Sequence, residues 1–178
     1  MDWISAYDSP LGRVTMASDG AALTGLWFEG QKHFGAGLSP EAEQKQLPVF
    51  DCAVRWLDLY FSGRDPGFAP PLAPRGTAFQ RTVWDELLRI PFGATVTYSQ
   101  LAARVKTSAR AIGSAVARNP VSLIIPCHRA VGANGDLVGY AGGTERKRLL
   151  LSMEKAEPSA LSPPGPACAN FHGSMDIH

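Results

Sequence analysis

Four prolines between residues 65 and 76 most strongly constrain how this chain of 178 residues can fold. They are Pro66, Pro70, Pro71 and Pro74. Proline lacks the backbone N–H that helices and central strands use, and it disfavours helix at the residue before it. No regular element is therefore expected to cross this segment. It predicts an extended connector between two differently built halves.

Charge changes at the same place. Residues 1–75 contain 6 lysines and arginines against 9 acidic residues, whereas residues 76–155 contain 11 against 5. Residues 87–135 contain six basic residues and no acidic one, although the whole chain has a net charge of only +1. Such a stretch favours a local contact with a polyanion. The alternative is a solvated face whose counter-charges come from elsewhere in the fold.

The first half is predicted to be rich in strands. Short runs at residues 3–7, 14–17 and 23–28 are separated by glycine and proline turn signals. Pro48 then opens a helix. Four apolar residues share one face of this helix: Phe50, Val54, Leu57 and Phe61. We assign residues 1–65 to an N-terminal domain and 66–76 to the connector.

The second half, residues 77–155, is predicted to be mainly helical. Thr77 caps a helix that ends near residue 90, Ser99 caps a helix over 100–105, and Ser108 caps one over 109–118. The last two match a helix-turn-helix, since basic residues occupy the turn and the second helix. The alternative is a two-helix corner inside a core.

Four further segments complete the chain. Residues 121–125 are expected to form a buried strand, and residues 131–138 a hairpin or wing around an Asn-Gly turn. Thr144 is predicted to cap a final helix that runs to about residue 155. Residues 156–178 contain four prolines and no lysine or arginine, which predicts a tail without a core.

The helix over 109–118 has an unusual composition. Between Arg110 and Arg118 its residues are small or apolar, whereas helices that read the major groove present Asn, Gln or Arg to the bases. Small side chains let a helix backbone come close to another surface. This composition favours a minor-groove contact without sequence readout, the alternative being a helix packed tightly inside the protein.

Cys127 is the candidate nucleophile. It follows the predicted strand, and the neighbouring His128 and Arg129 can supply the positive charge that favours a thiolate. A histidine base also needs an orienting acid, for which Asp136, Glu145 and Glu154 are the candidates. Taken alone, a Cys-His pair is more often a buried structural thiol.

Other classes of protein are excluded by simple features. The longest apolar runs are far too short to span a bilayer, and the N-terminus lacks the pattern of a secretory signal. Cys52, Cys127 and Cys168 lie 75 and 41 positions apart, which fits neither a disulfide framework nor a Cys-x-x-Cys metal site. We therefore expect an intracellular protein and assign no residue as a metal ligand.

The run IPCHR at residues 125–129 resembles the active-site signature of the O6-alkylguanine-DNA alkyltransferases. Further motifs similar to that family flank it in the same order, covering roughly residues 3–155. They are SPLG at 9–12, LYFSG at 59–63, GTAFQ at 76–80, IPFG at 90–93, TYSQLA at 97–102, RAIG at 110–113, RNP at 118–120 and GYAGG at 139–143. One such motif would be weak, but a collinear series is specific.

The resemblance implies an α/β architecture, with a ribonuclease-H-like domain followed by a winged-helix domain. It implies a monomer, cytoplasmic or nuclear according to the source, that needs no cofactor. The expected partner is double-stranded DNA containing O6-alkylguanine, bound through the minor groove. The implied reaction flips the base and moves its alkyl group, from O6 of guanine or O4 of thymine, irreversibly onto the cysteine.

Residue roles follow from the resemblance alone. Cys127 would accept the alkyl group, His128 (through a water) and Glu154 would remove its proton, Asn119 would brace the turn, and Tyr98 would bind and help protonate the guanine. Arg110 would fill the gap left by the base. The other expected DNA contacts are Thr77, Gln80, Ser114, Arg118 and Arg129. The expected base pocket comprises Ser122, Ala130, Tyr140 and Ala141, where Ser122 replaces a proline of some relatives and the small alanines could alter tolerance of bulky alkyl groups.

Three alternatives remain open at this point. A non-catalytic alkyltransferase-like protein would bind the lesion without repairing it, but such proteins carry tryptophan in place of Cys127. A Cys-His hydrolase would turn over repeatedly and would need an oxyanion hole. A winged-helix transcription factor would need base-reading side chains that the second helix lacks.

Overall fold

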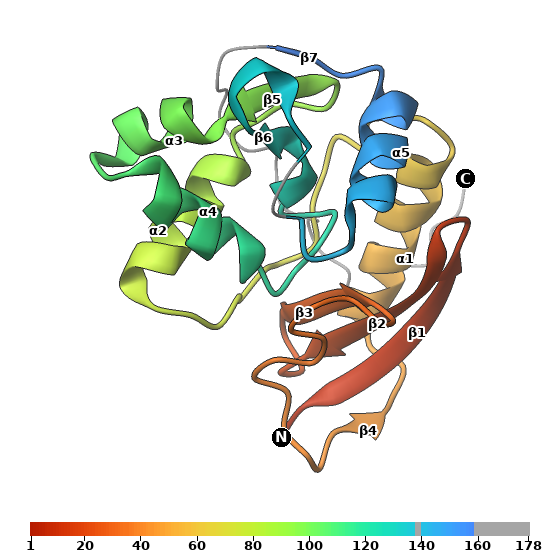
Figure 1. Cartoon of the computed structure of the whole chain (residues 1–178). Coiled ribbons are helices and arrows are strands. Elements are labelled where there is room, and N and C mark those ends of the chain that lie inside the picture. Colours follow the sequence, from red (N-terminus) through yellow and green to blue (C-terminus); the bar gives the residue numbers. More distant parts are fainter. Residues whose placement is uncertain (138–139, 159–178) are drawn as a thin grey trace.

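The computed structural model describes residues 1–137 and 140–158. The chain begins with a sheet of β1 (Trp3–Ser9), β2 (Gly12–Ser18), β3 (Leu23–Phe28) and β4 (Glu43–Gln44). Its strand order is β3-β2-β1-β4, with antiparallel pairs except β1 and β4 (Figure 1). The three predicted strands are confirmed. The two-residue β4 has no comparable sequence signal.

Helix α1 (Pro48–Phe61) packs against this sheet. Pro48 occupies its first turn, where the missing N–H costs nothing. Phe50 and Leu57 of the predicted stripe are buried, and Val54 and Phe61 pack at its margin. Cys52 lies in the same helix and is buried.

No helix or strand spans residues 65–76, as the prolines predict. The connector runs along the free edge of β3, where the Leu23 N–H donates to the Pro71 carbonyl (2.8 Å) and the Ala73 N–H to the Leu23 carbonyl (2.8 Å). This pairing helps to explain why every residue of β3 is buried, although β3 lies at the edge of its sheet.

The second half contains α2 (Ala78–Leu87), β5 (Ala94–Thr97), α3 (Tyr98–Val105) and α4 (Ala109–Ala117). Thr77 and Ser108 cap α2 and α4 as predicted, but α3 begins earlier than predicted. Thr97 caps α3, because its side chain accepts the Gln100 N–H while Gln100 bonds back to the Thr97 N–H. The expected Ser99 cap is therefore wrong.

The remaining elements surround the predicted site. They are the 3-10 turns η1 (Cys127–Arg129) and η2 (Ala133–Gly135), the strands β6 (Ala130–Val131) and β7 (Glu157–Pro158), and the helix α5 (Thr144–Glu154). The expected Thr144 cap is wrong, because Thr144 is the first residue of α5 and the preceding Gly143 has no side chain to cap it. Strands β6 and β7 pair in parallel with β5. Residues 157–158, which the sequence assigned to the tail, thus join a sheet. The rest of the predicted tail lies outside the described residues.

Residues 121–125 are buried but do not form the predicted strand. Leu123 has a φ of 71°, a left-handed conformation that bends the chain. The start of this segment binds β3, since the Leu26 N–H donates to the Pro120 carbonyl (2.8 Å) and the Ser122 N–H to the Leu26 carbonyl (2.9 Å). The sheet of the first half therefore holds the segment that leads to Cys127.

The predicted Asn-Gly turn is present at η2. Asn134 and Gly135 both have positive φ, and the Gly132 N–H donates to the Asp136 carbonyl (2.7 Å). Among residues 130–137, β6 is the strand that the structure shows, and residues 138–139 of the expected wing lie outside the described residues.

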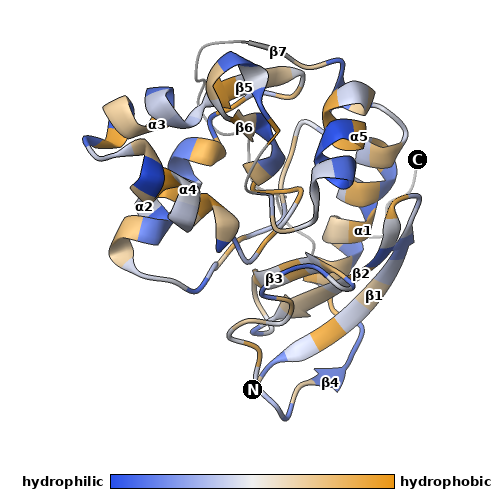
Figure 2. Ribbon diagram, viewed as in Figure 1, coloured by the Kyte–Doolittle hydropathy of each residue, from blue (hydrophilic) through white to orange (hydrophobic). Residues whose placement is uncertain are grey.

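Hydrophobic and hydrophilic residues alternate along α2 and α4, while β4 is hydrophilic (Figure 2).

Candidate active site

Asn119 closes the turn that presents Cys127. Its Nδ2 donates to the Ile125 carbonyl (2.8 Å), and its Oδ1 accepts the Val121 N–H (3.0 Å). Both bonds are buried, where few water molecules can compete for them. The arrangement fits the bracing role expected for Asn119.

Cys127 is a free thiol with 3% of its surface exposed, so a reacting group must enter a nearly closed site. Burial raises the pKa of the Cys127 thiol, although the Asn119 side chain and the positive charge of Lys147 oppose this shift. The thiol is consequently protonated at neutral pH. It needs a base before it can act as a nucleophile.

His128 can act as that base. Burial lowers the pKa of this fully buried side chain, so the ring is neutral at physiological pH. Its Nε2 lies 2.6 Å from Oε2 of Glu154. A neutral ring that donates from Nε2 to a carboxylate has a free lone pair on Nδ1. Among the described residues, His128 Nδ1 and Tyr140 Oη are the buried side-chain atoms without a hydrogen bond.

Glu154 accepts hydrogen bonds at both carboxylate oxygens. Oε1 receives Arg129 Nε (2.8 Å) and the Gly93 N–H (3.1 Å), and Oε2 receives the Tyr60 hydroxyl (2.5 Å) in addition to His128. Burial alone would raise the pKa of Glu154, but the contacts with His128 and Arg129 outweigh it and hold the pKa well below its usual range. Glu154 is therefore ionised.

Arg129 belongs to this buried cluster. Besides Glu154, its guanidinium binds the Ile90 carbonyl through Nη1 (2.8 Å) and lies 5.8 Å from the centre of the Phe92 ring. Only 7% of its surface is exposed. The side chain of Arg129 therefore neutralises a buried carboxylate, and its expected contact with DNA stays a prediction that this placement does not favour.

Three further side chains lie close enough to Cys127 to affect its charge or be affected by it: Lys147, Tyr98 and Tyr140. Lys147 is fully buried, and its Nζ donates to the Ala130 carbonyl (2.5 Å) and to Tyr98 Oη (3.4 Å). Burial lowers the pKa of Lys147 to about 8. Burial, and to a smaller extent the charge of Cys127, raises the pKa of Tyr98 to about 12. Burial also raises the pKa of Tyr140. Both tyrosines keep their protons and can donate hydrogen bonds.

Of the other expected pocket residues, Ala130 lies beside Lys147, whereas Ala141 and Ser122 contact the first half of the chain. Ala130 is buried, and its carbonyl already accepts Lys147, which leaves a second lone pair for a ligand. The Ala141 carbonyl accepts the Lys32 N–H (3.1 Å) from the first half. Ser122 is buried with Oγ 3.4 Å from Oε1 of Gln31, so the structure places it at the contact between the halves.

The expected DNA contacts lie on helix surfaces. Arg110, Ser114 and Arg118 follow one another at intervals of four along α4, and all three are exposed. Thr77 is exposed and Gln80 half-buried at the start of α2, where each caps the other's backbone N–H. Helix α4 therefore presents a basic face with little side-chain bulk between its arginines.

Sequence reasoning missed Lys147 and Tyr60. For Lys147 a signal exists, since Lys147, Leu150 and Glu154 are the buried residues of α5 and recur at helical spacing. Tyr60 lies outside the predicted stripe of α1. Its contact with Glu154 depends on how the two halves pack, which one sequence does not reveal.

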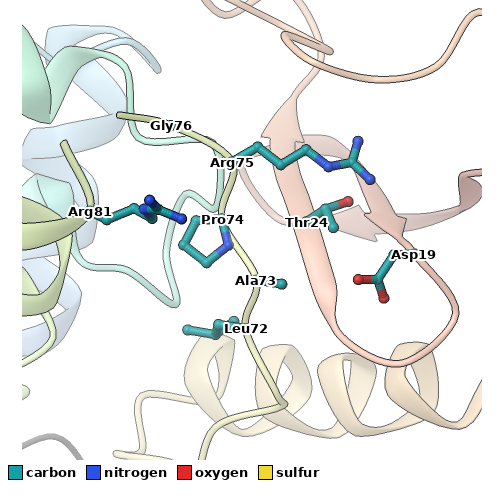
Figure 3. Close-up of a pocket in the computed structure, with 8 residues that line it drawn as sticks. All are labelled: Asp19, Thr24, Leu72, Ala73, Pro74, Arg75, Gly76 and Arg81. Atoms are coloured by element: carbon teal, nitrogen blue, oxygen red, sulfur yellow. The ribbon is translucent and has the colours of Figure 1, made fainter. Parts of the chain in front are cut away.

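A cavity of about 530 Å³ lies elsewhere, between the connector, β3 and α2. Figure 3 shows Arg75 extending from the connector over the sheet and Arg81 on the opposite side. None of the expected site residues lines it. In the described part of the chain, no three His, Cys, Asp or Glu side chains gather as metal ligands would. Each helix described there is too short or too polar to span a bilayer.

Known proteins match both halves of the chain. Residues 4–74 match the family described as 6-O-methylguanine DNA methyltransferase, ribonuclease-like domain, and residues 78–156 its DNA binding domain. The chain belongs to this family. A methylated-DNA–protein-cysteine methyltransferase of Haemophilus influenzae is 42% identical over 152 residues (84% of each chain), and one of Mycobacterium leprae is 43% identical over 154 residues (84% of this chain, 90% of the relative).

Solved structures of methyltransferases agree with this assignment. A crystal structure of Mycobacterium tuberculosis OGT in complex with DNA has a TM-score of 0.76 and 38% identity, and the match covers 88% of this chain and 96% of that one. The predicted fold class is confirmed: a ribonuclease-like α/β domain precedes a DNA-binding domain.

Proposed function

We propose that this methyltransferase repairs DNA by transferring an alkyl group from O6 of guanine, or O4 of thymine, to Cys127. The observation that carries the proposal is the adjacent arrangement of a buried thiol and a neutral histidine whose Nδ1 has no hydrogen-bond partner among the described residues, backed by an ionised Glu154. Relatives named methylated-DNA–protein-cysteine methyltransferase support the same activity.

The reaction balances without a cofactor. The Cys127 proton passes through a water molecule to Nδ1 of His128, and Glu154 stabilises the resulting imidazolium. The thiolate forms a bond to the alkyl carbon while the bond from that carbon to O6 breaks, and the electron pair stays on the guanine. The departing guanine takes up one proton, which Tyr98 helps to deliver, and this proton balances the one that Cys127 gave to His128. Because a thioether is a poor leaving group, each protein molecule reacts once.

Access to the alkyl carbon requires the base to leave the helix. Flipping costs a few kcal/mol and is easiest for a damaged base that pairs poorly. The exposed face of α4 supports binding at the minor groove, with Arg110 filling the vacated space and Thr77, Gln80, Ser114 and Arg118 contacting the DNA nearby. The protein acts as a monomer in this scheme.

A lesion-binding protein without transfer chemistry is the second candidate, but the free thiol at position 127 disfavours it. Incubation with duplex DNA containing O6-methylguanine, followed by intact mass measurement, separates the two. We expect one adduct of about 14 Da on the peptide that contains Cys127. Cys127→Ser should bind the same DNA and gain no mass. Binding without an adduct on the unmodified protein would reject the proposal.

A further inference from the structure

Tyr60 connects the ribonuclease-like half to the buried carboxylate of the site. It lies on α1, yet its hydroxyl donates to Oε2 of Glu154 (2.5 Å) and lies 3.2 Å from Nε2 of His128. These residues are separated from Tyr60 by 94 and 68 positions. Figure 1 shows α1 beside α5, the helix that ends with Glu154.

The Tyr60 ring is held on several sides. Trp56 stacks on it with ring centroids 4.9 Å apart, and Phe61 and Phe92 approach edge-on at 5.4 and 6.0 Å. The whole side chain is buried. Burial and the charge of Glu154 raise the pKa of Tyr60 well above its usual range, so the hydroxyl stays protonated. Tyr60 is therefore a rigid, permanent donor.

The two oxygens of Glu154 have different partners. Arg129 and the Gly93 N–H occupy Oε1, so Oε2 is shared by Tyr60 and His128. A hydroxyl fixed at Oε2 sets the direction from which His128 can donate. The same hydrogen bond reduces the negative charge on Oε2. That charge would otherwise favour the protonated, imidazolium form of His128.

We propose that Tyr60 is a positioning residue for alkyl transfer, whose hydroxyl holds Glu154 so that His128 keeps its proton on Nε2 and leaves Nδ1 as the base for Cys127. This inference rests on the proposed function. It makes the first half of the chain part of the proton relay, in addition to its structural support of the turn.

The charged and titratable groups around His128 set the expected pH effect. Besides Tyr60, they are Arg129 and Cys127 on η1, Glu154 and Lys147 on α5, and Tyr140. Among them Glu154 favours the imidazolium, whereas Arg129 and Lys147 oppose it. Removing the Tyr60 hydroxyl strengthens the Glu154 effect, because Oε2 then carries more negative charge. The pKa of His128 should therefore rise.

The test compares Tyr60→Phe with the unmodified protein in single-turnover transfer from O6-methylguanine duplex between about pH 5 and 9. Loss of one hydrogen bond to a charged group should slow transfer about tenfold at neutral pH and move the acid limb of the rate profile up by about one unit. Tyr7→Phe is the matched control. It removes another tyrosine–carboxylate bond of α1, from Tyr7 Oη to Asp58 (2.6 Å), and should keep the original profile.

The final yield of methylated protein gives the number of molecules able to react, whereas the rate constant describes how fast those molecules react. If the unmodified protein gains no methyl group, the proposed function fails. If it does and Tyr60→Phe has the same rate and profile, or loses only yield, the inference about Tyr60 is overturned.

A second measurement needs no variant. Nitrogen-15 NMR of histidine-labelled protein should show the His128 proton on Nε2 at neutral pH. A proton on Nδ1 would overturn the inference even if Tyr60→Phe does not fold.

Discussion

Burial determines the chemistry of the individual residues at the site. Because burial lowers the pKa of His128, the ring remains a base at pH values where an exposed histidine, with a pKa near 6.5, is already protonated. The rate of alkyl transfer should therefore fall on acidification only below about pH 6.5. Single-turnover rates measured across this range test the expectation. A rate that is already halved above pH 7 would contradict it.

Arg110 is the residue whose role depends most on DNA structure. Arg110→Ala should slow repair of O6-methylguanine in duplex DNA about tenfold, because the gap left by the flipped base is no longer filled. Reaction with the free base should change little. Arg64→Ala, another exposed arginine, is the control for net charge. Equal losses on duplex and free base would reject the role in the base stack.

Several site residues could be predicted from the sequence because their motif is local. Asn119, Cys127 and His128 lie within ten positions, and the structure brings them together with the more distant Glu154. The buried role of Arg129 could not be predicted, since an arginine beside a nucleophile can equally face DNA. Only the packing of α5 and the loop before β5 against η1 decides this.

At the scale of elements, the prolines and two of the four expected caps predicted boundaries, whereas the expected caps at Ser99 and Thr144 were wrong. Thr77 and Ser108 lie at helix starts, where each side chain accepts a backbone N–H as its residue type predicts. The apolar run over 121–125 has the composition of a strand, but it bends at Leu123 and supplies only one bridge to β3. A short apolar run establishes burial more reliably than it establishes conformation.

Gly113 tests whether α4 approaches DNA closely. A Cβ at this position would meet no heavy atom within 4 Å, so Gly113→Ala should stabilise α4 by about 0.5–1 kcal/mol. The same methyl group should weaken binding to duplex DNA if the helix enters the groove. Unfolding in urea and DNA titration measure the two effects.

Gly76→Ala provides the contrast for Gly113→Ala. Its Cβ would lie 2.3 Å from the Trp84 ring, which predicts destabilisation by about 1–3 kcal/mol. Unchanged DNA affinity in a stabilised Gly113→Ala would contradict the close approach of α4.

At the scale of the whole molecule, Asp2 ties the N-terminus to the connector. Arg75 binds both oxygens of Asp2 at 2.7 and 2.9 Å, and this bond, only partly opposed by burial, lowers the pKa of Asp2 to about 2. Because the folded pKa lies below the unfolded value near 4, the pair stabilises the protein above about pH 4. The contribution is lost as the pH falls towards 2.

Asp2→Asn should therefore reduce the free energy of unfolding by about 1 kcal/mol at pH 7, a value limited by the partial exposure of Arg75. The difference from the unmodified protein should shrink by pH 3. Glu29→Gln, which removes an exposed pair with Arg13, should change neither value. A deficit that is the same at pH 7 and pH 3 would contradict the ion-pair explanation.

The central claim, that Cys127 keeps the alkyl group it takes, is tested most directly by counting repaired bases. A fixed amount of protein is mixed with increasing excesses of duplex containing O6-methylguanine, and the remaining lesions are quantified after long incubation. We expect repair to stop at one base for each active molecule, whatever the excess. Repair that continues to rise with time beyond this number would show turnover and contradict the account.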